Sequence, residues 1–215
     1  MKESREYSKK VQKLYRTLKR QPARHTGAEF DEPVDAIVYA VVSENMTEAQ
    51  AQSAIKKLKD YFVDWTDLRV AVVDEIAEVL GQETATARNM ATALVNSLKA
   101  VFEKYNMLSL QALKKLGKRP AKQVLEKFAG ATPFVVDYCM LTALQGHAIP
   151  LTPKMIEYLK TNGLAHAEAG YEEIEGFLAR QIPMKSAHDF YSLLRHESES
   201  PKAQKAKKTK PAKKT

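Results

Sequence analysis

Apolar residues that recur at steps of three and four are the feature that most constrains the fold of this chain. The pattern is clearest over residues 84–105, where it persists for about four turns, on Met90, Ala91, Leu94, Val95, Leu98, Val101, Phe102 and Tyr105. This spacing places the side chains on one face of an α-helix. No segment alternates as a strand does, and the 215 residues include only 8 Gly. We therefore predict an all-α fold.

The same periodicity predicts further helices on both sides of this segment. Two of them begin at sequences typical of a helix start: Pro33 at a first helical position, and Thr47 with Gln50 three residues later. Residues 133–144 are apolar almost all round, which predicts a central, buried helix. The other expected helices cover about residues 3–20, 73–80, 109–116, 120–128 and 171–178, with two more between Pro150 and Asn162 and around residues 187–194.

The net charge of +8 is concentrated at the two ends of the chain. Residues 201–215 hold seven Lys and no acid, and residues 1–24 hold nine Lys or Arg against two Glu, so each segment carries +7. Residues 25–200 then carry −6, which argues against a uniformly basic nucleic-acid-binding core. Any affinity for phosphate must come from the ends or from a local patch.

Cysteine content and hydropathy narrow the class of protein further. Cys139 is the single cysteine, so the chain can form neither an internal disulfide nor a four-cysteine cluster, and we expect no cofactor. The five His residues lack a two-His helical metal spacing, so no metal site is expected. No apolar run reaches the roughly 18 residues of a membrane helix, so we expect a soluble protein of the cytoplasm. We also expect it to be a monomer.

The most informative stretch is residues 124–138, which predicts two helices joined by a tight turn. Gly130 suits a turn with a positive φ angle, and Thr132 with Pro133 forms a favourable helix start. The N–H groups of Gly130, Ala131 and Thr132 at such a start can bind an anion, and a DNA phosphate would suit them. An ordinary helical turn beside a solvated face is the alternative.

Basic residues precede this turn. Residues 114–127 hold six Lys or Arg against Glu126 alone, a local charge of +5 within an acidic core. We expect four of them to contact DNA phosphates: Lys118, Arg119, Lys122 and Lys127. The Lys-rich segment 201–215 could add non-specific phosphate affinity, or it could serve solubility or an acidic partner.

The turn and its surroundings resemble the endonuclease III family of helix-hairpin-helix DNA glycosylases. Phe128 to Val136 lies where the family has its hairpin, and Ser43 to Thr47 is similar to the family's Ser-Gln-Asn loop. Phe62 to Leu68 is similar to a family segment of the form Phe-Pro-Asp-Trp. Residues 149–155 lie where the family has Pro-Val-Asp-Thr-His-Val, and the resemblance covers about residues 30–196.

The resemblance implies a two-lobed fold. We expect a six-helix lobe over residues 30–150 with the hairpin at 124–144, and a C-terminal helical lobe over residues 151–197. A basic helix within residues 1–24 would pack against the C-terminal lobe. We predict that residues 198–215 are disordered, because no large apolar residue there offsets the entropy of ordering. The four-cysteine iron–sulfur cluster that many family members carry is not expected, because no Cys follows Cys139.

Two residues that the family uses for catalysis are missing. The lyase members form a Schiff base through a hairpin Lys, and that position is Phe134 here. An Asp that activates the nucleophile or stabilises the sugar cation corresponds to Thr152. Asp137 is a weak substitute, Lys154 and Glu44 are others, and Asp137 could equally be a carboxylate paired with a nearby base.

Asn45 is the candidate to fill the gap left by a flipped nucleotide, as the family's loop does, or else it is an ordinary loop residue.

Three hypotheses about function follow. The leading one is a protein that binds damaged or abasic double-stranded DNA without the family's catalysis. The second is an active glycosylase that uses another carboxylate such as Asp137, and the third is a helical protein-interaction domain.

Overall fold

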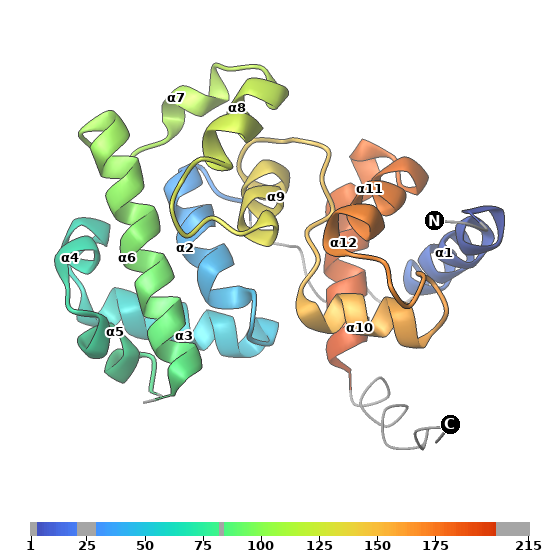
Figure 1. Ribbon diagram of the computed structural model, residues 1–215, viewed down its shortest axis with the longest axis horizontal. Helices are drawn as coiled ribbons and strands as arrows, with labels where there is room; N and C mark the ends of the chain where they lie inside the picture. Colours follow the sequence, from blue (N-terminus) through green and yellow to red (C-terminus); the bar gives the residue numbers. More distant parts are fainter. Residues whose placement is uncertain (1–3, 21–28, 82–83, 201–215) are drawn as a thin grey trace. The chain divides into compact units, whose positions relative to one another are not determined.

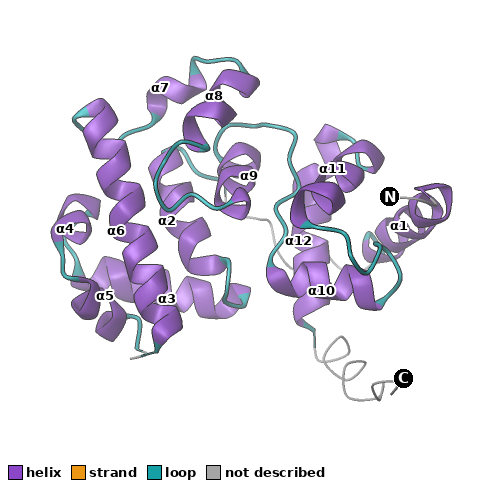
Figure 2. Ribbon diagram, viewed as in Figure 1, coloured by secondary structure: helices purple, strands orange, loops and turns teal. Residues whose placement is uncertain are grey.

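The computed structural model describes residues 4–20, 29–81 and 84–200, and within these ranges all regular structure is α-helical (Figure 2). This confirms the predicted all-α class. The chain divides into two compact units, one of residues 28–150 and one that joins residues 1–27 to residues 151–215. Each unit is described by itself. None of the described helices is both long and apolar enough to cross a membrane.

The unit of residues 28–150 contains eight of the described helices (Figure 1). They are α2 (Pro33–Ser43), α3 (Glu48–Tyr61), α4 (Trp65–Val70), α5 (Val73–Val79), α6 (Ala85–Tyr105), α7 (Gln111–Lys114), α8 (Lys118–Leu125) and α9 (Pro133–Thr142).

Two helices form the centre of this unit, α2 and α9. They pack against each other, and α2 also contacts α3 and α6. Nearly every residue of α2 is buried, as is every residue of α9 from Phe134 to Thr142. The prediction of a central, buried helix at 133–144 is thus confirmed, with its end two residues earlier. Helices that are apolar on all sides can only be stable when surrounded by protein.

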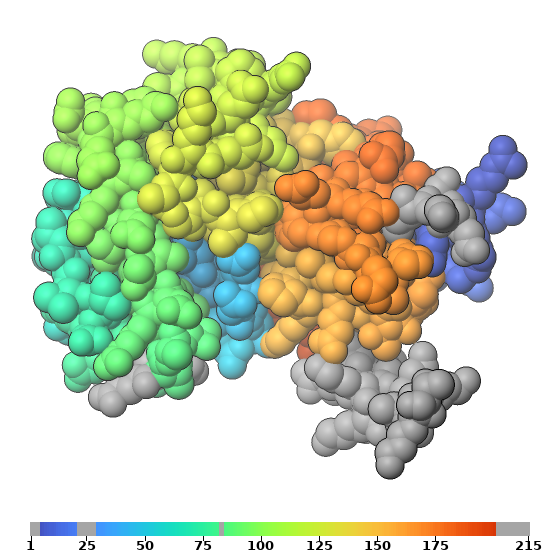
Figure 3. All heavy atoms as spheres, in the orientation of Figure 1, coloured from blue at the N-terminus to red at the C-terminus, as the bar shows by residue number. Residues whose placement is uncertain are grey.

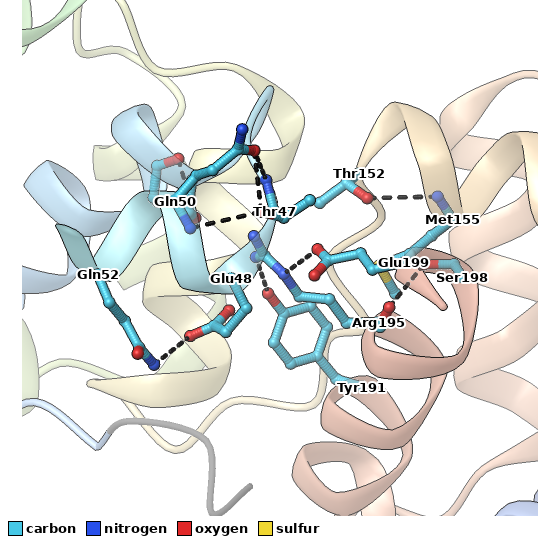
Figure 4. Close-up of polar contacts among 12 residues, drawn as sticks. Thr47, Glu48, Gln50, Gln52, Thr152, Met155, Tyr191, Arg195, Ser198 and Glu199 are labelled. Atoms are coloured by element: carbon cyan, nitrogen blue, oxygen red, sulfur yellow. Dashed lines mark hydrogen bonds and ion pairs between the residues drawn. The ribbon is translucent and has the colours of Figure 1, made fainter. Parts of the chain in front are cut away.

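Helix α6 matches the expected segment 84–105 within one residue. Thr84 caps its start by accepting a hydrogen bond from Ala87 N at 3.2 Å. Asn106 ends it in the left-handed region with φ 54°, a conformation that Asn tolerates better than most residues. Its apolar face packs against α4 and α5. At α3, the expected capping box of Thr47 and Gln50 is present (Figure 4).

The sequence did not predict α4, which brings the helices described in this unit to eight. Asp64 caps α4 by accepting from Thr66 N and Asp67 N, and Trp65 Nε1 donates to Asp35 Oδ1 at 2.6 Å. Six residues are too short for a helical period to be recognised, and Trp65 is fixed by a contact with a residue thirty positions earlier.

The second unit contains α1 (Ser4–Leu18), α10 (Pro153–Thr161), α11 (Tyr171–Gln181) and α12 (Met184–Glu199) among its described residues. α1 packs against α11 and α12, and α10 against α12. The Tyr15 and Phe190 rings meet edge to face with centroids 5.4 Å apart. The core of the unit includes Val11, Leu18, Met155, Leu159, Ile174, Phe177, Phe190 and Leu194.

The predicted start of disorder at residue 198 is wrong. Helix α12 continues to Glu199, since Arg195 Nε contacts Glu199 Oε1 at 3.1 Å one turn later and Ser198 Oγ donates to Arg195 O at 2.8 Å (Figure 4). Side-chain bonds of this kind offset the entropy of ordering a polar segment. The remainder of the expected tail, residues 201–215, lies outside the described residues, as do residues 21–24 of the expected N-terminal segment.

Candidate nucleic-acid interface

The predicted hairpin is present in the unit of residues 28–150. Helix α8 ends at Leu125, three residues earlier than expected, and α9 begins at Pro133. The connection is a series of turns in which Phe128 N donates to Leu125 O and Ala131 N donates to Phe128 O, both at 3.1 Å. Thr132 caps α9, and its Oγ1 accepts from Val135 N at 3.2 Å.

Gly130, in the turn of the hairpin, lies close against α6. Its φ is +84°, the region that favours glycine. A Cβ atom built on Gly130 would lie 2.8 Å from the backbone oxygen of Ala93 and 2.9 Å from Ser97 Oγ. Ser97 also donates to Ala129 O at 3.3 Å, which ties the turn to α6. The sequence identified the turn glycine, but only the fold shows the close approach.

Glu44 is a residue of this site that the sequence placed only in a neighbouring loop. Thr132 Oγ1 donates to Glu44 Oε2 at 3.1 Å, so a carboxyl group lies at the start of α9. Burial raises the pKa of Glu44, and the hydrogen bond from Thr132 only partly opposes this. A contact between residues 88 positions apart leaves no local signal in a sequence.

The basic residues before the turn differ in how they are used. Lys118 Nζ donates to Leu144 O, and Lys122 Nζ lies 2.8 Å from Asp137 Oδ1. Both side chains therefore have intramolecular partners. Arg119 and Lys127 are exposed, and neither has an assigned ion pair or hydrogen bond to the described residues. Of the four cations predicted to contact phosphate, these two are the most available to an external anion.

Asp137 is buried, with 4% of its side chain exposed, beside the Lys122 ammonium. This geometry agrees with a carboxylate paired with a nearby base, the alternative raised for Asp137 from the sequence. A carboxylate buried in this way needs such a cationic partner to offset its loss of hydration. The pairing accounts for an acidic residue on an otherwise apolar helix.

Phe134, which the resemblance places where the family has its Lys, is part of the core. It is 1% exposed, and its ring centroid is 5.8 Å from that of Tyr138. Tyr138 stacks on Tyr39 at 5.6 Å, and Phe30 contacts both tyrosines. The side chain at this position therefore contributes to an aromatic cluster.

Thr152, which the resemblance places where the family has its Asp, lies in the other unit and caps α10. It is 2% exposed, and its Oγ1 accepts from Met155 N at 3.3 Å (Figure 4). Thr and Asp are both good N-caps. The local structural role is thus filled here by a residue that carries no charge. Lys154 is an exposed residue in the first turn of the same helix.

Asn45 is exposed in the loop between α2 and α3, next to Glu44. It lines a hollow of about 270 Å³ together with residues of α3 and α6. The loop that carries the predicted DNA wedge therefore also contacts the hairpin, through Glu44 and Thr132. Cys139 is buried on α9, and burial raises the pKa of its thiol. Among the described residues, no group of three or more potential metal ligands is found.

No protein-family model matches the chain. A protein of Arabidopsis thaliana that is named as a candidate DNA glycosylase is 26% identical over 166 residues, which is 77% of this chain and 56% of that protein. The chain thus spans little more than half the length of this relative.

Solved structures of DNA glycosylases share the fold. A non-covalent endonuclease III–DNA complex aligns with a TM-score of 0.69 at 18% identity, over 90% of this chain and 91% of that chain. The 8-oxoguanine glycosylase/lyase of Clostridium acetobutylicum, bound to double-stranded DNA, aligns with a TM-score of 0.68 at 15% identity, over 90% of this chain and 69% of that chain. The 3-methyladenine DNA glycosylase MagIII of H. pylori aligns with a TM-score of 0.65 at 16% identity, over 91% of this chain and 97% of that chain.

The motifs at Phe128 to Val136 and Ser43 to Thr47 indicated the same family from the sequence. The chain therefore has the all-α fold of the endonuclease III-like helix-hairpin-helix DNA glycosylases, the family that its motifs resemble.

Proposed function

We propose that this chain is a DNA-binding protein of base-excision repair that recognises damaged or abasic double-stranded DNA without the lyase chemistry of endonuclease III. The observation that carries the proposal is the α8–α9 hairpin, in which Arg119 and Lys127 are exposed, Thr132 caps the start of α9, and Phe134 is buried where the resemblance places the family's Lys. The similarity to solved glycosylase–DNA complexes supports a DNA partner. Such a protein would act where DNA is, at the nucleoid.

The hairpin suits a phosphate for two physical reasons. At the start of α9 the N–H groups of Thr132 and Phe134 have no assigned partner among the described residues, and the helix dipole favours an anion there. Ala131, which the sequence predicted as a further donor to an anion, instead donates its N–H to Phe128 O. Arg119 and Lys127 add two charges that can displace counterions from the DNA. Neither contact depends on a base, so the proposed binding would follow DNA shape and damage more than sequence.

The two cations can be tested together. The variant Arg119→Gln/Lys127→Gln is expected to bind an abasic duplex about tenfold more weakly, and to reduce the slope of log affinity against log salt by about 1.8, because two phosphate contacts are lost. Fluorescence anisotropy over a salt series measures both quantities. Lys56→Gln/Lys99→Gln removes the same charge from exposed positions of α3 and α6 and is the matched control. Equal losses in the two variants would mean that the hairpin is not the DNA site.

The absence of lyase chemistry needs a separate readout. With borohydride present, the wild-type chain should bind the abasic duplex but form no covalent complex, because Phe134 offers no amine. Base-release assays on damaged duplexes then separate a binding protein from a glycosylase that acts without a Schiff base. A trapped complex would refute the proposal and would require a search for the amine responsible.

A second candidate function is an active glycosylase, and Glu44 now favours it more than Asp137 does. Asp137 is engaged by Lys122, whereas burial favours the protonated form of Glu44, next to the hairpin. A carboxyl group with a raised pKa can donate a proton to a leaving base. This candidate requires base release that depends on Glu44.

Glu44→Gln separates the two candidates and tests the pKa of Glu44. In the folded state this pKa is raised, so ionisation of Glu44 destabilises the fold as the pH rises above its unfolded value of 4.5. The free energy of unfolding of the variant should therefore exceed that of wild type at pH 7, and the two should be equal below pH 4.5. Urea denaturation at both pH values measures the difference. The variant should also bind DNA more tightly at pH 7, because a carboxylate beside the phosphate site is removed.

Two results would contradict this reasoning. A stability difference that stays constant between pH 4 and pH 7 would mean that ionisation of Glu44 is not its cause. If the wild-type chain releases a damaged base and Glu44→Gln loses this activity while it still binds DNA, the chain is an active glycosylase and not a binding protein alone.

A further inference from the structure

A second surface of the unit of residues 28–150 combines exposed apolar side chains with acidic ones. Four large apolar residues are exposed within a short stretch around α4, and Val63 is 93% exposed. The four are Tyr61, Val63, Val70 and Val72. Large apolar side chains exposed at several nearby positions of a chain can mark a protein-interaction site.

The same stretch is strongly acidic. Residues 60–80 hold six Asp or Glu against Arg69 alone, a charge of −5 that mirrors the +5 of residues 114–127. Three of the acids, Asp60, Glu75 and Glu78, line a hollow of about 470 Å³ between α3 and α5, with Tyr61 and Lys57. Glu75, Glu78 and Asp67 all raise the pKa of Tyr61, so their negative potentials add up at this point of the surface.

This surface is separate from the hairpin within its unit. α4 and α5 pack against α6, whereas α8 packs against α9, which packs against α2 (Figure 1). Helices α2 and α6 contact each other and lie between the two regions. Figure 3 shows the teal segment around α4 at the surface on the opposite side of the unit from the hairpin. Both regions can therefore be occupied at the same time.

We infer that this surface, formed by the four apolar residues and the acidic hollow, is a docking site for a Lys- or Arg-rich segment of a partner protein that also carries apolar residues. Charge complementarity selects the partner: a basic side chain enters the hollow beside Asp60, Glu75 and Glu78, while the apolar side chains of the segment pack on Val63, Val70 and Val72. Nucleic acid is disfavoured, because its phosphates would face three carboxylates in the hollow against the single cation of Lys57.

The test uses the full chain and two fluorescein-labelled peptides, one of repeated Lys-Lys-Leu units and one of repeated Lys-Lys-Ser units. We expect the Leu peptide to bind about tenfold more tightly than the Ser peptide, because only it can use the apolar residues. Asp60→Asn/Glu75→Gln/Glu78→Gln should weaken binding of the Leu peptide about tenfold. These amide substitutions keep the size of each side chain. Tyr61 Oη donates to Glu75 at 3.1 Å, and the amide oxygen introduced by Glu75→Gln can still accept this bond.

The control is Glu168→Gln/Glu172→Gln/Asp189→Asn, which removes the same charge from exposed acids of the other unit and should change affinity less than about twofold. Equal losses in both variants, or equal binding of the two peptides, would overturn the inference in favour of general charge attraction. The inference would also be overturned if the wild-type chain sediments as a dimer and Asp60→Asn/Glu75→Gln/Glu78→Gln sediments as a monomer, because a second copy would then occupy the surface. The DNA affinity of this triple variant should stay at or above that of wild type.

Discussion

Gly130→Ala is expected to destabilise the unit of residues 28–150 by about 2 kcal/mol or more. Two effects add together. Alanine is strained at a φ of +84°, and its Cβ would lie 2.8 Å from the backbone oxygen of Ala93. A backbone atom of a packed helix cannot move aside as a flexible side chain can, so either α6 or the turn must shift. Urea denaturation monitored by circular dichroism measures the loss.

The same substitution should weaken binding of an abasic duplex, because the turn positions the start of α9. Gly176→Ala is the matched control. Gly176 lies inside α11 without a positive φ, and its added Cβ would meet only the end of Arg180, at 3.5 Å. There alanine should stabilise the helix by roughly 0.5–1 kcal/mol and leave DNA affinity unchanged. A Gly130→Ala chain as stable as wild type would show that the turn does not need this backbone conformation.

Phe134→Ala is expected to cost about 3–4 kcal/mol of stability. The ring is 1% exposed and belongs to the cluster of Phe30, Tyr39 and Tyr138, so its removal leaves a cavity in a close-packed region. For a chain of this size such a loss lowers Tm by roughly 10 °C. Calorimetry measures the shift, and Phe134→Leu, which retains most of the apolar volume, should lose about 1.5 kcal/mol or less.

The variant Phe134→Lys tests whether position 134 can accept the Lys that the resemblance implies for it. Phe134→Lys should lose at least as much stability as Phe134→Ala, because an ammonium group would replace a ring in apolar surroundings. Reintroducing the family's Lys alone is thus expected to give no lyase activity, in a borohydride trap with abasic DNA. A stable Phe134→Lys chain would mean that position 134 faces water more than the burial of its ring indicates, and would reopen the question of catalysis.

The helical class and most helix positions could be predicted from the sequence. Apolar periodicity located α6 within one residue, and local capping pairs such as Thr47 with Gln50 marked where helices begin. Gly130 and Thr132 identified the turn, whereas the assignment of Phe134 and Thr152 to the family's Lys and Asp positions stays a prediction of the resemblance. These signals are local: each depends on backbone preferences and on residues within one or two turns of each other.

Tertiary structure alone decided which side chains meet. The pairing of Asp137 with Lys122, the contact of Glu44 with Thr132 and the approach of Gly130 to Ala93 join residues that are distant in sequence. The same holds for α4, whose Trp65 is fixed by Asp35, and for the acidic hollow between α3 and α5. Burial and ionisation depend on the groups that surround a side chain in three dimensions, and neither periodicity nor spacing specifies those neighbours.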